Sequence, residues 1–182
     1  MLIESTMTRY VGALAFLVTA SLSAQPAQYV GAGSCSGSNC HGATTPQNES
    51  QSRILGNEYS LWTVRDKHSK AYTVLADPRS RRMAQILSLG DAQTSQRCLS
   101  CHGVGSPPKL LSDGVACEAC HGPGKDHPEK VGKGYGAFGG TPGCLTCHTV
   151  ENSPDFDAAA YLLKIKHWKT EGEAGAPSSV GR

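Results

Sequence analysis

The pattern of apolar and polar residues predicts short helices joined by long loops. Residues 56–77 repeat apolar or histidine side chains at helical spacing on one face, namely Leu61, Val64, His68, Ala71 and Leu75. Asp77-Pro78 starts a second helix, with Asp as cap and Pro at the first helical position, and Gly90 is its natural stop. Ser153-Pro154 repeats this start signal for a helix running to about His167. Strand signals are nearly absent, so we expect a mostly α fold with long loops and little or no sheet.

Both ends of the chain differ from this pattern. Residues 11–22 form an apolar run that follows Arg9, precedes small residues and is too short to span a bilayer. We therefore expect residues 1–24 to be a signal peptide, cleaved after Ser23 or Ala24; an uncleaved membrane anchor is the alternative. The polar, Gly/Ala/Ser-rich residues 169–182 predict a disordered tail. Residues 25–168 would then form one domain, periplasmic or secreted, with no membrane span after cleavage.

The composition supplies little apolar area for a core made of protein alone. Hydrophobic residues make up 38% of the 182 residues and aromatic residues only 6%, while glycine occurs 21 times. Chains with so little apolar area to bury usually need a metal, disulfides or another staple. The eight cysteines are the candidates for that staple.

The cysteines occur in four pairs, and each pair is followed directly by a histidine. Three pairs have two intervening residues: Cys98/Cys101 before His102, Cys117/Cys120 before His121, and Cys144/Cys147 before His148. The first pair, Cys35/Cys40 before His41, has four.

This arrangement is that of covalent haem attachment. Two thiols add to the two vinyl groups of one porphyrin, and the adjoining histidine becomes the proximal iron ligand. Zinc sites do not require histidine after every second cysteine, and disulfides require no histidine. We therefore expect four covalent haems c, which form the core of a multihaem cytochrome c fold.

Charge adds little to this interpretation. The formal net charge is +2, and four haems with ionised propionates would bring it to about −2. Basic residues such as Arg79, Arg81 and Arg82 are as well suited to propionates as to outside partners. Nothing indicates a nucleic-acid partner.

Three histidines remain for the distal side of four irons: His68, His127 and His167. His68 and His167 lie on apolar helical faces, the latter with Phe156, Ala160 and Leu163. A buried histidine needs a partner, and iron is the partner available here. The fourth iron would be five-coordinate, completed by a neighbouring molecule, or bound by Met83, which can equally be a packing residue.

Several segments together resemble the tetrahaem cytochrome c-554 family. They are the stretch 62–75 with His68-Ser69-Lys70-Ala71, the run from Cys117 to Gly124 followed by His127, and Cys147-His148 with 153–157 and His167. The resemblance implies three bis-His haems and an open haem on His102. It implies that His68 serves the third haem, His127 the first and His167 the fourth. The longer first cysteine motif departs from the family pattern.

We expect the protein to transfer electrons between redox partner proteins rather than to act as an enzyme. The resemblance suggests a donor such as a hydroxylamine-type oxidoreductase, although the residues name no partner. Two alternatives stay open: reduction of a small ligand such as nitric oxide at an open haem, and assembly into a conductive cytochrome filament. An oligomer is compatible with either.

Overall fold

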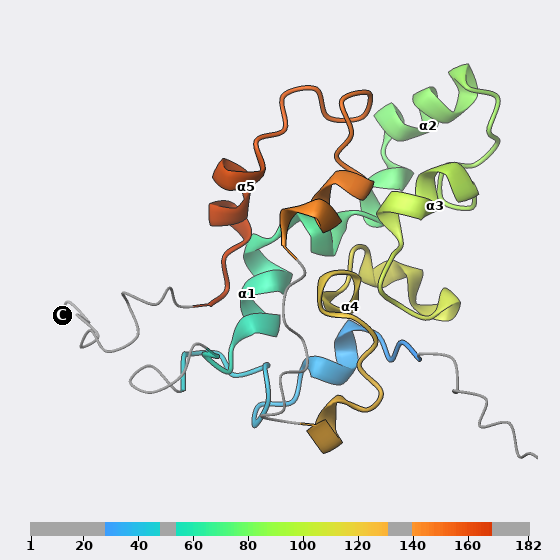
Figure 1. The fold of residues 1–182 in the computed structure, drawn as a ribbon. Helices are drawn as coiled ribbons and strands as arrows, with labels where there is room; N and C mark the ends of the chain where they lie inside the picture. The colour runs from blue at the N-terminus through green and yellow to red at the C-terminus, as the bar shows by residue number, and fades with distance from the viewer. Residues whose placement is uncertain (1–27, 48–53, 131–139, 169–182) are drawn as a thin grey trace, which may run out of the picture.

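The computed structural model describes residues 28–47, 54–130 and 140–168 (Figure 1). The predicted signal peptide and tail lie outside these residues. The α-helices are α1 (Glu58–Arg65), α2 (Pro78–Ile86), α3 (Gln96–His102), α4 (Cys117–His121) and α5 (Ala158–Ile165). Single 3-10 turns lie at Ala32–Cys35, Lys67–Lys70, Thr73–Ala76, Pro108–Asp113, His127–Lys130 and Thr141–Thr146.

No strand occurs in the described ranges, and the prediction of a mostly α fold with loops is confirmed. The nearest approach to a sheet is a single parallel bridge between Val104 and Val115. None of the helices in these ranges has the length and apolar character needed to cross a membrane.

The single helix predicted over 56–77 is wrong. Asp66 has an extended backbone (φ −84°, ψ 121°) that ends α1 after Arg65. Its side chain accepts a hydrogen bond from the backbone N–H of His68 and so caps a new 3-10 turn. Local capping by Asp66 thus interrupts a hydrophobic period that continues along the sequence, and Val64 on the predicted inner face is 82% exposed.

Helix α2 starts at Pro78 as predicted but ends before Gly90. Ser88 adopts φ 54°, the left-handed conformation. The N–H of Leu89 bonds the carbonyl of Ala84, and the N–H of Ser88 bonds that of Gln85. This is the Schellman C-cap, formed here with serine in the place usually taken by glycine.

The C-terminal helix starts later than Ser153-Pro154 predicts. Asp157 is the N-cap of α5, because its carboxylate accepts from the N–H groups of Ala159 and Ala160. The helix ends at Ile165, so His167 lies beyond it. Leu163, placed by the sequence on a buried face with His167, is 73% exposed.

The protein core is small in the described part of the chain. Its buried hydrophobic residues are two leucines and five alanines: Leu75, Leu99, Ala32, Ala43, Ala84, Ala92 and Ala116. Leu75, Ala84, Ala92 and Leu99 form one cluster, which joins α2 to α3; the two helices lie side by side in Figure 1.

Candidate functional site

The four cysteine motifs have different local structures. The second and third lie within α3 and α4, where one helical turn separates the two thiols. The fourth lies on the 3-10 turn Thr141–Thr146 and the residues after it. All eight cysteines carry free thiols.

The longer first motif forms a tight turn. The N–H groups of Cys40 and Gly42 both bond the carbonyl of Gly37, at 2.9 and 3.0 Å. A Cβ atom on Gly42 would lie 1.8 Å from the carbonyl oxygen of Ser36, so only glycine fits there. The two extra residues are therefore taken up in a compact loop between the thiols, directly before His41.

Six of the seven histidines face each other in three pairs. The ring centroids of His41 and His127 are 6.1 Å apart, those of His68 and His148 are 6.1 Å apart, and those of His121 and His167 are 6.0 Å apart. A histidine nitrogen lies about 2.0–2.1 Å from a bound transition metal, and the ring centre roughly 1 Å farther. Two rings on opposite sides of one ion are thus about 6 Å apart. The pairs fit a metal ion held between two imidazoles.

Each pair combines one motif histidine with one of the three left over. This pairing of rings differs in part from the order of ligands that the family resemblance implies. His68 faces the fourth motif histidine, His148, and His167 faces the third, His121, whereas the resemblance implies the reverse for these two. His127 faces the first, His41, which is the order that the resemblance implies.

His102 belongs to none of these pairs. Its Nδ1 lies 2.7 Å from the carbonyl oxygen of Ala71, directly after the turn that carries His68. Met83, the other ligand considered for this motif, lies on α2 with 53% of its surface exposed. In the described ranges, no group of three or more His, Cys, Asp or Glu side chains is arranged to hold a metal ion.

Acceptors at Nδ1 orient several of these rings. The partner of His41 is the carboxylate of Glu58 at 2.9 Å, and that of His68 is Asp66 at 3.0 Å. The partner of His148 is the hydroxyl of Ser153 at 3.1 Å, and that of His167 is the carbonyl of Ile165 at 2.9 Å. An acceptor at Nδ1 fixes that nitrogen as the N–H and leaves Nε2 as the free donor for a metal.

Electrostatics differ between these histidines. The hydrogen bond to Glu58 raises the pKa of His41. Burial lowers the pKa of His167 and of His148, which favours the neutral imidazole that binds metals.

Thiols of different motifs lie next to each other. A hydrogen bond with Cys117 lowers the pKa of Cys35 to about 7, and the same contact raises the pKa of Cys117. Cys147 makes the corresponding contact with Cys101, and burial raises its pKa further. The first motif therefore touches the third, and the second touches the fourth.

Glu118 is a site residue to which sequence reasoning gave no role. It lies between the two cysteines of the third motif and is only 4% exposed. Its carboxylate accepts from the backbone N–H groups of Val30, Gly31 and Gly124. This buried charge ties the start of the described chain to the loop after His121. A carboxylate inside a cysteine motif was its only signal in the sequence.

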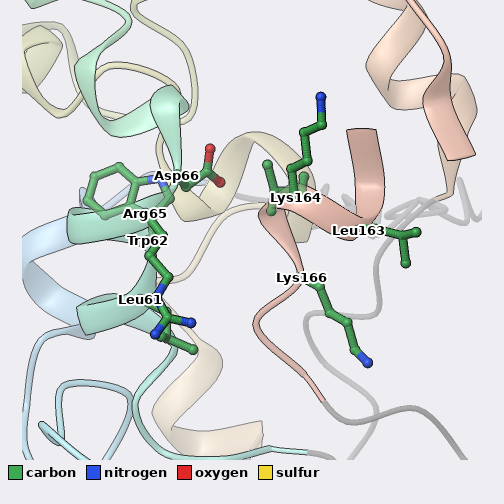
Figure 2. A pocket seen from close by; sticks show the side chains of 8 residues that line it. Leu61, Trp62, Arg65, Asp66, Leu163, Lys164 and Lys166 are labelled. Atoms are coloured by element: carbon green, nitrogen blue, oxygen red, sulfur yellow. The ribbon is translucent and has the colours of Figure 1, made fainter. Parts of the chain in front are cut away.

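A cavity of about 110 Å³ lies between α1 and the end of α5 (Figure 2). Leu61, Trp62, Arg65 and Asp66 line one side, and residues 163–166 line the other. Three basic side chains, Arg65, Lys164 and Lys166, surround it, between the segments that carry His68 and His167. The cavity thus combines apolar side chains with three basic side chains and one acidic side chain, Asp66.

Comparison with known proteins agrees with this geometry. Residues 34–122 match the family described as cytochrome c554 and c-prime. The match covers the first three cysteine motifs, whereas the fourth motif, His127 and His167 lie beyond it. No curated protein and no solved structure matches the chain. Residues 34–122, just under half of the chain, are thus similar to the cytochrome c554 and c-prime family, and this similarity supports an electron-transfer haem protein with covalently bound c-type haem.

Proposed function

We propose that this protein binds four haems through its four cysteine motifs and carries electrons between redox proteins outside the cytoplasm. The observation that carries the proposal is the set of three histidine pairs at 6.0–6.1 Å, each including one motif histidine. The bound haems supply a one-electron Fe(III)/Fe(II) couple. The residues of the chain hold, orient and insulate them.

The proposed attachment residues are the eight cysteines, in the pairs Cys35/Cys40, Cys98/Cys101, Cys117/Cys120 and Cys144/Cys147. The proximal ligands are His41, His102, His121 and His148. The distal ligands are His127 for the first haem, His167 for the third and His68 for the fourth.

This geometry suits a carrier. The two rings of each pair come from separate segments of the chain, so each is held independently of the metal between them. The acceptors at Nδ1 of His41, His148 and His167 limit rotation of the rings. A ligand set that does not rearrange between oxidation states keeps the reorganisation on electron transfer small.

Contacts between motifs support transfer within the molecule. Cys35 touches Cys117, and Cys101 touches Cys147. The Val104–Val115 bridge joins the segments after the second and before the third motif. The four attachment sites are therefore adjacent to one another, as a chain of closely spaced haems requires.

The intact mass of the exported protein tests this proposal. It should exceed the mass of the mature polypeptide by four haems, and the reduced protein should show low-spin bands from at least three. A gain of three haems would show that the longer motif at Cys35 and Cys40 is not used. A protein exported without haem would refute the proposal.

Reduction of a small ligand is the second candidate, and the position of His102 favours it. This histidine faces no second histidine, so its haem would have one side free for a ligand such as nitric oxide. Steady-state consumption of nitric oxide by the reduced holoprotein separates the two functions. Binding without turnover supports the carrier.

A further inference from the structure

Glu58 is the first residue of α1, and both of its carboxylate oxygens are held in place. Oε2 lies 2.9 Å from Nδ1 of His41. Oε1 accepts from the backbone N–H groups of Leu55 and Gly56, at 2.5 and 3.1 Å. The side chain is 14% exposed. The carboxylate is therefore fixed against the ring of the first motif histidine rather than free in solvent.

Donors surround the carboxylate of Glu58. Oε2 faces the ring of His41, and Oε1 accepts from two backbone N–H groups. Hydrogen bonds to both oxygens favour the charged form of a carboxyl group, so a negative charge lies behind His41 in the folded protein.

Two other motif histidines have an uncharged acceptor at Nδ1. Nδ1 of His102 contacts the backbone carbonyl of Ala71, and Nδ1 of His148 contacts the hydroxyl of Ser153. Asp66 provides a carboxylate to His68, a distal histidine, and the same oxygen also accepts from the backbone N–H of His68. Oδ1 of Asp66 therefore serves both the ring and the backbone, whereas in Glu58 the ring of His41 is at Oε2 and the two backbone N–H groups are at Oε1.

A carboxylate at Nδ1 makes the imidazole a stronger electron donor at Nε2. Stronger donation stabilises the ferric state relative to the ferrous state, and the nearby negative charge acts in the same direction. Both effects lower the reduction potential of a haem bound to that histidine. A carboxylate at Nδ1 is thus a feature of the first motif histidine, His41, that the second and fourth motif histidines lack.

We propose that Glu58 is a positioning residue that selectively lowers the reduction potential of the haem on His41. This inference rests on the proposed function, since it assumes haem at the first motif. Because Cys35 contacts Cys117, a low potential at the first motif favours movement of an electron from that site to the third. An electron lost by a haem held at His41 would be gained by a haem held at His121, so the step would balance within the molecule.

The test is Glu58→Gln in the tetrahaem holoprotein, followed by a spectroelectrochemical titration. Glutamine keeps one oxygen for the backbone N–H groups and has nearly the same volume, but removes the charge. We expect the reduction potential of one haem to rise and those of the other three haems to remain unchanged. A tenfold loss of preference for ferric iron would appear as a rise of 59 mV in that one-electron step. The ferric electron paramagnetic resonance signal of one low-spin haem should shift with it.

Two further variants make the result specific. Asp155→Asn removes an exposed carboxylate and should leave all four potentials unchanged, which controls for net charge. Asp66→Asn should raise the reduction potential of a different haem, and by a smaller amount than Glu58→Gln raises the first. If Glu58→Gln and Asp66→Asn shift the same step, the assignment to His41 is wrong.

The outcomes separate this inference from the proposed function. Failure of the wild type to carry four haems would remove the proposed function itself. Four haems in wild type and variant, with unchanged potentials and unchanged resonance signals, would overturn only the role of Glu58. If Glu58→Gln does not retain its haems, Glu58→Asp replaces it. That variant keeps the charge but shortens its reach, and unchanged potentials and signals there would likewise overturn the inference.

Discussion

Helices α3 and α4 carry the same type of cysteine motif, yet they are stabilised in different ways. Leu99 and Glu118 both directly follow the first cysteine of their motif, and both are buried, at 8% and 4% exposure. Leu99 packs into the apolar cluster with Leu75, Ala84 and Ala92. Glu118 instead accepts hydrogen bonds from the backbone of Val30 and Gly31, which are distant in the sequence, and from that of Gly124 in the loop after its own motif.

The difference shows that the motif fixes the spacing of its thiols but not what supports it. The position after the first cysteine points into the protein when the motif is an α-helix. In the fourth motif, which lies on a 3-10 turn, the equivalent Leu145 is 55% exposed. The residue at this position therefore decides whether apolar packing or a buried charge anchors a helical motif.

The histidines of the two motifs also differ. His121 on α4 faces His167, whereas His102 on α3 belongs to no histidine pair. The α3 motif thus depends on the protein core, and the α4 motif depends on polar contacts and a second histidine. The following predictions test this contrast, from the largest expected effect to the smallest.

The largest effect is expected when the thiols of α4 are removed. Cys117→Ser with Cys120→Ser should lose one haem and most of the tertiary structure, because α4 contributes no residue to the apolar cluster of Leu75, Ala84, Ala92 and Leu99. Cys98→Ser with Cys101→Ser should also lose one haem, but keep the packing between α2 and α3. Intact mass and hydrogen exchange of the two double variants measure the difference. If α3 and α4 are equally protected from hydrogen exchange in both double variants, the two motifs are not stabilised in different ways.

The second prediction concerns the paired histidine of α4. His167→Ala should convert the haem on His121 from low-spin to high-spin and raise its potential, since one nitrogen ligand is lost. Electronic absorption and paramagnetic resonance spectra measure the change. His127→Ala is the matched variant and should affect a different haem, so the double variant should show two additional high-spin signals. Spectra of His167→Ala identical to those of the wild type would exclude this ligand.

These predictions show which parts of the site the sequence could supply. The thiols, the adjoining histidines and the three remaining histidines follow from local spacing, because one helical turn or one loop sets each motif. The pairing of His68 with His148 and of His121 with His167 does not follow, since it joins residues far apart in the chain. Only the tertiary arrangement determines which rings face each other.

The fold shows the same limit. The start of α2 was predicted, because a cap and a proline define it locally. The break at Asp66 was missed, because the helical period continues across it while its side chain caps the next turn. Glu58 gave no signal as a site residue, and the position of Glu118 inside a cysteine motif did not reveal its role, because both roles depend on backbone groups and rings that folding brings close.

The third prediction compares the two equivalent motif positions. Leu99→Ala should reduce the free energy of unfolding of the holoprotein by about 2–5 kcal/mol, through lost burial and the cavity left behind. Glu118→Gln should cost about 1–3 kcal/mol, because an amide N–H₂ would face backbone N–H donors. Chemical denaturation followed by circular dichroism measures both values.

Local stability should distinguish these two variants further. Glu118→Gln should increase hydrogen exchange at Val30 and Gly31, whose N–H groups donate to the Glu118 carboxylate in the wild type. Leu99→Ala should leave these two amides protected. If Leu99→Ala increases hydrogen exchange at these amides as much as Glu118→Gln does, the two motifs are stabilised by the same contacts and the contrast between them is wrong.

The smallest effect is expected at Met83. This residue lies on α2, next to Ala84 of the cluster that supports α3, and half of its surface is exposed. We expect the haem on His102 to have an open or weakly held sixth position, with a high-spin ferric signal from one haem in four and uptake of carbon monoxide on reduction. Met83→Leu keeps volume and helix propensity and should change neither property.

A wild type that is wholly low-spin, with a high-spin haem only in Met83→Leu, would make Met83 the ligand and weaken the case for small-ligand reduction. A wholly low-spin wild type that gains a high-spin haem on dilution would instead point to a ligand from a second molecule. Uptake of carbon monoxide alone supports an open position but not catalysis, because a carrier has no need of a fourth distal histidine.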